Sequence, residues 1–149
     1  MLKYIVLGLF VLLFNVLDSV STHIGLHKLP EKLRASESNP LMAGLMAHDN
    51  LLSEIVKHLF VFLLVVYFVY SKNAFILLAL AIVLGIVVLS NTYTIVGRII
   101  TKRKIITPFG YLLRILKIPK SLDFFIFVIV FLGFAYWLAQ YIVDRGNWL

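Results

Sequence analysis

Apolar residues dominate four stretches of this sequence, and polar residues interrupt them only briefly. Each stretch is close to the roughly 20 residues that a helix needs to cross the hydrocarbon core of a bilayer. The pattern therefore predicts an all-α membrane protein, a bundle of four transmembrane helices in a single domain over residues 1–149. The predicted spans are about 2–22, 51–70, 74–93 and 122–143.

The connections between these spans differ in length. Only residues 71–73 separate the second span from the third, so we expect an antiparallel hairpin there. The connections at 23–50 and 94–121 are longer and carry most of the charge. With four spans, these two connections lie on the same side of the membrane.

Both long connections contain a signal for a further helix. Asn39 can cap free backbone N–H groups and Pro40 suits a first helical position, so a helix is expected to begin there. This helix either continues into the second span or breaks near 48–50, and we favour the break. In the later connection, two prolines bracket an apolar stretch with Arg114 and Lys117, which predicts an interfacial helix lying in the headgroup plane.

The composition agrees with a membrane protein and excludes several kinds of site. With 62% hydrophobic and 14% charged residues and a mean hydropathy of +1.00, the chain cannot cover a soluble core with polar surface. It has no cysteine, which excludes disulfides, thiolate metal sites and cysteine nucleophiles. The first apolar run lacks a small-x-small cleavage site, so we expect it to stay as a span.

The formal net charge of +7 is concentrated in the two long connections. Because basic residues favour the cytoplasmic side, we expect a multi-pass plasma-membrane protein with both termini outside. The aromatic residues expected at the outer interface are Tyr4, Tyr67, Tyr70, Trp137, Tyr141 and Trp148. We expect anionic lipid headgroups on the cytoplasmic side to contact Lys102, Arg103, Lys104, Arg114 and Lys117. Topology already accounts for this charge, so no nucleic-acid partner is predicted.

Polar residues inside the spans gather in one leaflet. The spacing of Asn15, Asp18 and Thr22 places them on one helical face. Lys57 lies at a similar depth, so we predict that it pairs with Asp18, with Glu54 as its rival partner. The hydrogen bonds of this pair are expected to be completed by Asn15, Thr22 and Asn91. The whole predicted polar or ligand-binding cluster is Asn15, Asp18, Thr22, Glu37, Asn39, Glu54, Lys57 and Asn91. Such a cluster either fixes helix packing or binds a ligand, and the sequence leaves both open.

Metal and enzyme chemistry have weaker signals. His23 and His27 are four residues apart, and Glu37 could be a third ligand, but paired histidines near an interface are more often solvated. We therefore predict no metal site and no cofactor. Ser19 beside Asp18 lacks the surroundings of a serine nucleophile, so no catalytic residue is assigned.

The pattern Asn15-x-x-Asp18-x-x-x-Thr22, followed by Glu37-x-Asn39-Pro40, Lys57 and Asn91, resembles a family of small four-span membrane proteins. This family is known as domain of unknown function 5658. The resemblance covers roughly the first two thirds of the chain. It implies a four-span fold and supports the polar cluster as a site, but it implies no activity.

Three functions remain compatible with the sequence. The leading one is a small binding or accessory membrane protein, whose polar pocket in the cytoplasmic leaflet holds a polar ligand, a headgroup or a residue of a partner. The second is a structural subunit of a larger membrane complex or a homo-oligomer. The third is an intramembrane enzyme or an ion or proton pathway that uses Asp18, Glu37 and nearby histidines.

Overall fold

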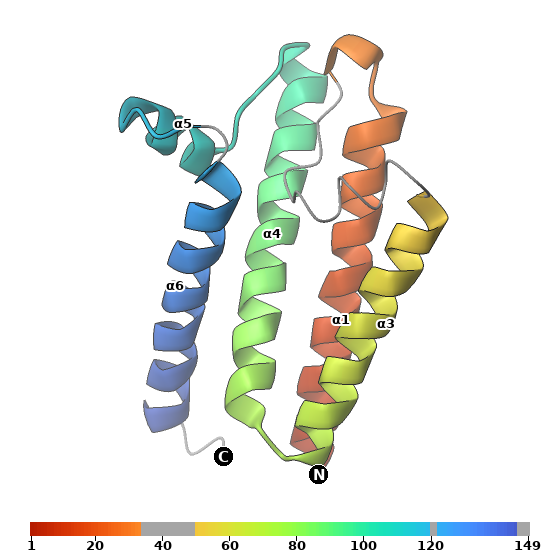
Figure 1. Cartoon of the computed structure of the whole chain (residues 1–149), viewed down its shortest axis with the longest axis vertical. Helices are drawn as coiled ribbons and strands as arrows, with labels where there is room; N and C mark the ends of the chain where they lie inside the picture. The colour runs from red at the N-terminus through yellow and green to blue at the C-terminus, as the bar shows by residue number, and fades with distance from the viewer. Residues whose placement is uncertain (34–49, 120–121, 146–149) are drawn as a thin grey trace.

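The computed structural model describes residues 1–33, 50–119 and 122–145, and within these ranges the chain is helical without β-strands. Four helices are long and apolar enough to cross a bilayer. They are α1 (Leu2–His23), α3 (Asn50–Tyr70), α4 (Ala74–Thr101) and α6 (Asp123–Arg145), and they run side by side (Figure 1). The predicted all-α fold with four long apolar helices is confirmed.

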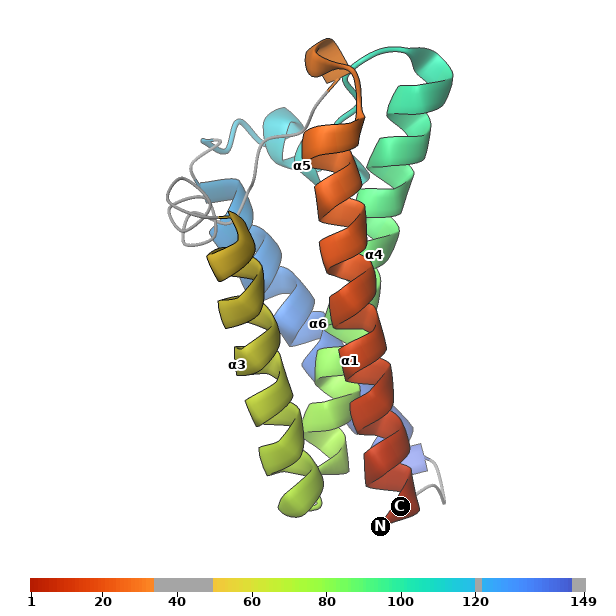
Figure 2. The same cartoon turned by 90° about the vertical axis from the view of Figure 1, so that its right-hand side faces the viewer.

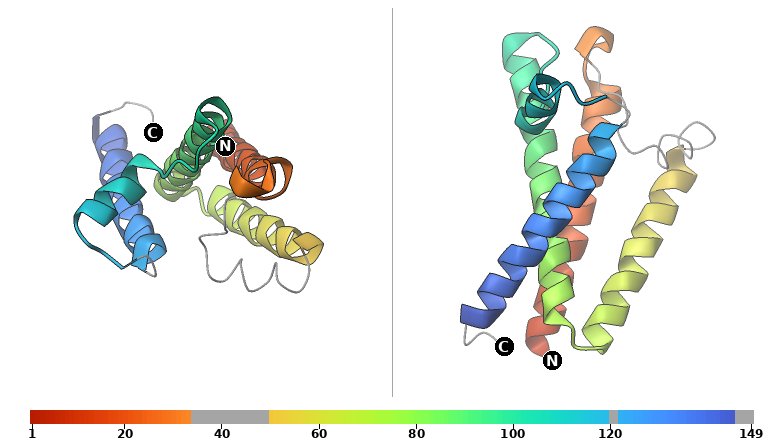
Figure 3. Two further views of the ribbon diagram at one scale, coloured as in Figure 1. Left: turned by 90° about the horizontal axis from the view of Figure 1, so that it is seen from above. Right: turned by 60° about the vertical axis from the view of Figure 1, so that its left-hand side comes forward.

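Helix α4 lies at the centre of the bundle. It packs most extensively against α1 and also against α6, while α3 packs mainly against α1. Viewed along the bundle, α3 and α6 lie on opposite sides of α4 (Figure 3). The first three long helices therefore form one packed group, and α6 is added to its outer side.

The bundle has two distinct ends. The N-terminus, the turn between α3 and α4 and the last turn of α6 lie at one end, which we call the terminal end (Figure 2). The start of α3, the last turn of α4 and the short helix α5 (Pro108–Ile115) lie at the opposite, loop end. The described parts of the two long connections, which the sequence predicts to be on one side, therefore lie at the same end.

In the half of the bundle nearest the terminal end, which we call the terminal half, apolar side chains pack the helices together. Val11 of α1, Val65 of α3, and Leu77 and Ala81 of α4 form its buried core. Gly8 lets α1 and α3 approach closely, because a Cβ at this position would lie 2.9 Å from Cγ1 of Val65. Small residues permit such close approach between membrane helices, where packing replaces the hydrophobic effect as the attraction.

The hairpin between α3 and α4 forms as expected. Lys72 adopts a left-handed conformation with φ 54°, and the Asn73 side chain accepts a hydrogen bond of 3.0 Å from the backbone N–H of Ile76. This cap satisfies one of the free N–H groups at the start of α4. The turn therefore reverses the chain within the three residues available.

Two helices are longer than the spans predicted from hydropathy. α4 continues to Thr101 instead of ending at Tyr93, and α1 continues through a π-helical segment, η1 (Ile24–Lys28). Polar residues do not end α4, because the Thr94 hydroxyl donates to the carbonyl of Ser90 within the helix over 2.9 Å. With 28 residues, α4 is about 42 Å long, which exceeds a hydrocarbon core of about 30 Å.

The predicted helix between the third and fourth spans is present as α5. It begins with Pro108 at its first position, and the side chain of Thr107 accepts a hydrogen bond of 3.0 Å from the Gly110 N–H. Phe109 packs edge-on against Phe127 and Phe131 of α6, at centroid distances of 5.6 and 5.2 Å. α5 lies across the loop end of α6 (Figure 1), and its location in the headgroup plane remains a prediction.

Candidate functional site

An ion pair joins α1 to α3 in the loop-end half of the bundle. Nζ of Lys57 donates to Oδ2 of Asp18 over 2.6 Å, and the two side chains are 18% and 13% exposed. Asn91 of α4 donates to the other carboxylate oxygen, Oδ1, over 3.0 Å. The predicted pairing of Asp18 with Lys57 is therefore present, and all three helices contribute to it.

Hydroxyl groups of α1 extend this arrangement, which we call the ion-pair branch. Lys57 also donates to Ser19 over 2.9 Å, while Asn91 donates to Ser21 over 3.2 Å and to Thr22 over 3.4 Å. The Ser21 hydroxyl donates to the Asp18 carbonyl over 2.9 Å. The partners of Lys57 and Asn91 in this branch lie on α1, so the branch ties α3 and α4 to one turn of α1.

A second group, the histidine branch, consists of Asn15, His58 and Glu54. Nδ2 of Asn15 donates to Nδ1 of His58 over 2.7 Å. Nε2 of His58 lies 3.5 Å from Oε2 of Glu54, one helical turn away on α3. We had expected Asn15 to complete the bonds of the Asp18–Lys57 pair, and this expectation was wrong. Because α1 and α3 are antiparallel, moving back from Asp18 to Asn15 moves forward from Lys57 to His58.

The two branches differ in how completely their polar atoms are satisfied. Asn15 is 1% exposed, yet its Oδ1 has no hydrogen-bond partner among the described residues. Oε2 of Glu54 is also buried without one, because 3.5 Å is too long for a hydrogen bond to His58. A buried polar atom without a partner is costly. The histidine branch therefore has two unused acceptors, and both flank the same imidazole.

Three residues belong to the cluster that the sequence pattern did not predict as members: Ser19, Ser21 and His58. Ser21 lies three residues after Asp18, so helical spacing could have identified it. His58 could not be identified in the same way, since its contact with Asn15 depends on the antiparallel register of two helices. Glu37 and Asn39, also predicted members, lie outside the described residues.

The histidines considered for metal binding lie on exposed surface. The rings of His23 and His27 are 5.0 Å apart between centroids, in a tilted arrangement. Glu37, the suggested third ligand, lies outside the described residues. Among residues 1–33, 50–119 and 122–145, no three His, Cys, Asp or Glu side chains are grouped to hold a metal ion.

The basic residues at the loop end fall into two kinds. The five predicted headgroup contacts are exposed: Lys102, Arg103, Lys104, Arg114 and Lys117. Arg98 is different, because its guanidinium donates to the carbonyl of Leu33 over 3.0 Å and to that of Ile105 over 3.2 Å. Ile105 also packs on Gly97, where a Cβ would approach its Cδ1 to 2.7 Å. Arg98 thus joins the two long connections.

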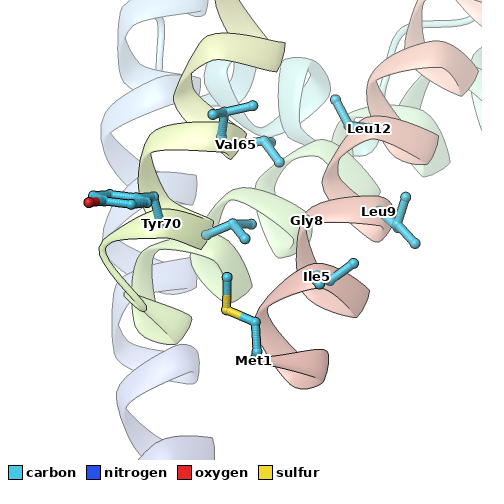
Figure 4. A pocket seen from close by; sticks show the side chains of 9 residues that line it. Met1, Ile5, Gly8, Leu9, Leu12, Val65 and Tyr70 are labelled. Atoms are coloured by element: carbon cyan, nitrogen blue, oxygen red, sulfur yellow. The ribbon is translucent and has the colours of Figure 1, made fainter.

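Two cavities lie away from the polar cluster. One, of about 320 Å³, is an apolar groove between α1 and α3 at the terminal end, lined by residues such as Met1, Ile5 and Tyr70 (Figure 4). The other, of about 310 Å³, lies at the loop end between Leu29, Leu33 and Ile99, with Lys32 and Lys102 among its lining. Neither cavity contains a residue of the ion-pair or histidine branch.

Comparisons with known proteins identify one relationship. No curated protein and no solved structure matches the chain. The family model described as Domain of unknown function (DUF5658) matches residues 9–97. This match includes every described residue of the two branches and ends before α5 and α6. The chain therefore belongs to the DUF5658 family of unknown function.

Proposed function

We propose that this membrane protein binds a polar ligand at the cluster formed by α1, α3 and α4, without catalysing a reaction. The observation that carries the proposal is the buried amide of Asn15, whose Oδ1 has no partner among the described residues. An amide buried in a membrane protein normally uses its acceptor, because the bilayer core offers no water to replace a missing bond. A bound molecule with a hydrogen-bond donor supplies the missing partner.

The contrast between the branches supports binding over a purely structural role. In the ion-pair branch, Asp18 and Lys57 satisfy each other and are mostly buried, as expected for a contact that fixes helix register. In the histidine branch, the side chains of Glu54 and His58 are 30% and 38% exposed, and acceptors remain unused. We therefore assign the ion-pair branch to holding the helices and the histidine branch to ligand contact.

The distribution of charge supports a cytoplasmic loop end in the plasma membrane, with both termini outside. Eight described basic residues lie at the loop end: Lys28, Lys32, Arg98, Lys102, Arg103, Lys104, Arg114 and Lys117. Three described basic residues lie at the terminal end: Lys3, Lys72 and Arg145. Positive charge near membrane helices favours the cytoplasmic side, and exposed lysines there attract anionic headgroups.

Native mass spectrometry of the full chain, extracted from its membrane in mild detergent, tests the binding proposal. We expect an additional bound mass on the wild type that is lost in Glu54→Gln and in Asn15→Leu. Glu31→Gln is the matched control, because Glu31 is exposed in a short 3-10 helix outside both branches. A wild type that carries no bound mass, or a mass that all three variants retain, contradicts the proposal. Stoichiometric recovery of a second protein in its place favours the structural-subunit function.

A further inference from the structure

We infer that the ligand of the histidine branch is a protonated primary amine, bound through its N–H donors to Asn15 and Glu54. This inference rests on the proposed function and specifies the chemical class of its ligand. The two unused buried atoms, Oδ1 of Asn15 and Oε2 of Glu54, are both acceptors. A ligand that satisfies them must carry at least two donors, as a primary ammonium group does.

The hydrogen-bond roles around His58 explain why acceptors are left over. Because Nδ1 accepts from Asn15, the ring carries its proton on Nε2, which faces Glu54. At 3.5 Å this contact leaves Oε2 without a hydrogen bond, and Asn15 has already used its Nδ2 on the ring. The branch therefore contains two buried oxygen atoms, one on each neighbour of the imidazole, and neither accepts a hydrogen bond from a described residue.

Charge leads to the same ligand class. The described ionisable groups of the cluster are the carboxylates of Asp18 and Glu54, the ammonium of Lys57 and the imidazole of His58. Lys57 is paired with Asp18 at 2.6 Å, and the ring of His58 lies 3.5 Å from Glu54, so Oε2 of Glu54 has no hydrogen-bonded cation among the described residues. An isolated carboxylate at the edge of a membrane span is unfavourable, and a bound cation relieves this cost. An anionic ligand would instead increase the repulsion.

The depth of the branch suits an amine at the membrane surface. Glu54 is four residues from the first residue of α3, Asn50, which corresponds to about 6 Å along the helix axis. This places its carboxylate close to headgroup level, and 30% of the side chain is exposed. Both the headgroup of phosphatidylethanolamine and a soluble alkylamine present the required –NH₃⁺ group. A quaternary ammonium has the same charge but no N–H donor, which makes it the matched comparison.

Two arms of one experiment separate these sources. In the lipid arm, the full chain is reconstituted in nanodiscs of phosphatidylethanolamine or phosphatidylcholine, each with the same share of phosphatidylglycerol. In the soluble arm, the detergent-solubilised chain receives ethylammonium or tetramethylammonium chloride at equal concentration. Thermal unfolding is followed by circular dichroism at 222 nm. We expect the donor-bearing amine to raise Tm by about 3 °C over its quaternary counterpart in at least one arm.

Variants link that difference in Tm to the histidine branch. We expect Glu54→Gln and Asn15→Leu each to abolish the difference, and Glu31→Gln to retain it. Two separate site variants are used so that a folding defect in one does not decide the result. A difference in the lipid arm alone identifies a headgroup, and one in the soluble arm alone identifies a free amine.

Equal Tm values for amine and quaternary ammonium in both arms would overturn the inference, as would a difference that Glu54→Gln and Asn15→Leu both retain. If native mass spectrometry still shows a bound mass that these variants lose, the proposed function stands and the ligand belongs to another class. If no bound mass is found either, both proposals fail together.

Discussion

The two halves of the α1, α3 and α4 group hold their helices together by different means. In the terminal half, apolar side chains and the close approach at Gly8 provide the contacts. In the loop-end half, an ion pair and a set of hydrogen bonds connect the same helices. Shape complementarity needs no chemical specificity, whereas a buried charge must find one particular partner. The polar half therefore fixes the register of the helices, and the apolar half packs in that register.

The same comparison separates stability from the proposed binding role. The apolar residues of the terminal half contact one another or face outward, and they have no unmet hydrogen bonds to offer a ligand. In the loop-end half, the ion-pair branch is largely satisfied and the histidine branch is not. Substitutions in the terminal half and the ion-pair branch should change folding, while those in the histidine branch should mainly change binding.

The largest effect is expected in the ion-pair branch. Lys57→Met leaves the buried Asp18 carboxylate without its cation and should lower the free energy of unfolding by about 3–5 kcal/mol. The double variant Asp18→Asn with Lys57→Met removes both charges and should lose much less. Unfolding in mixed micelles, titrated with SDS, measures both. Equal losses for the single and the double variant would show that the pair does not fix the register.

A smaller loss is expected from the terminal half. Gly8→Val introduces a Cβ that would lie 2.9 Å from Val65, so α1 and α3 must separate, at a cost of about 1–3 kcal/mol. Gly133→Ala is the control, because a Cβ on α6 at this position meets no atom within 4 Å. The same SDS titration should show little change or a slight gain for the control. If Gly8→Val left the SDS midpoint unchanged, α1 and α3 would not depend on close packing at Gly8.

A substitution of Arg98 tests the contacts at the loop end, outside both branches. Arg98→Ala removes the donors to the Leu33 and Ile105 carbonyls and should cost about 1–2 kcal/mol, since water replaces the lost donors only in part. Arg103→Ala changes an exposed side chain and should have almost no effect. Comparison of their midpoints in the SDS titration checks this. Similar values for the two would mean that Arg98 acts only as another surface charge.

The smallest change in stability is expected for Asn15→Leu. It removes one interhelical hydrogen bond, worth about 0.6 kcal/mol in a membrane protein, and also removes the unpartnered Oδ1. The SDS midpoint should therefore shift by less than for Lys57→Met, Gly8→Val or Arg98→Ala, while the bound mass in the native spectrum is lost. A large loss of stability would instead assign Asn15 to holding the helices.

Hydropathy alone was sufficient to predict the four helices and the hairpin at 71–73. It could not predict where α4 ends, because hydropathy records the apolar stretch and not the continuing backbone hydrogen bonds of the helix. Helix spacing placed Asp18 and Thr22 on one face, and comparison of depths suggested Lys57 as the partner. No spacing rule along one helix could assign Asn15 to His58, since that contact depends on two helices. The role of Arg98 was missed for the same reason.

The sequence by itself therefore determined that this is a four-helix membrane protein of the DUF5658 family with polar residues near one end of the bundle. The apolar pattern and helical periodicity are properties of the chain, so they can be read without a fold. Only the tertiary structure decided which polar atoms are satisfied and which are left over. A hydrogen bond between helices depends on their register and on angstrom-scale distances. The two branches look alike in sequence but differ in their hydrogen bonding. Asp18 and Lys57 pair with each other, whereas Asn15 and Glu54 each retain an unused acceptor.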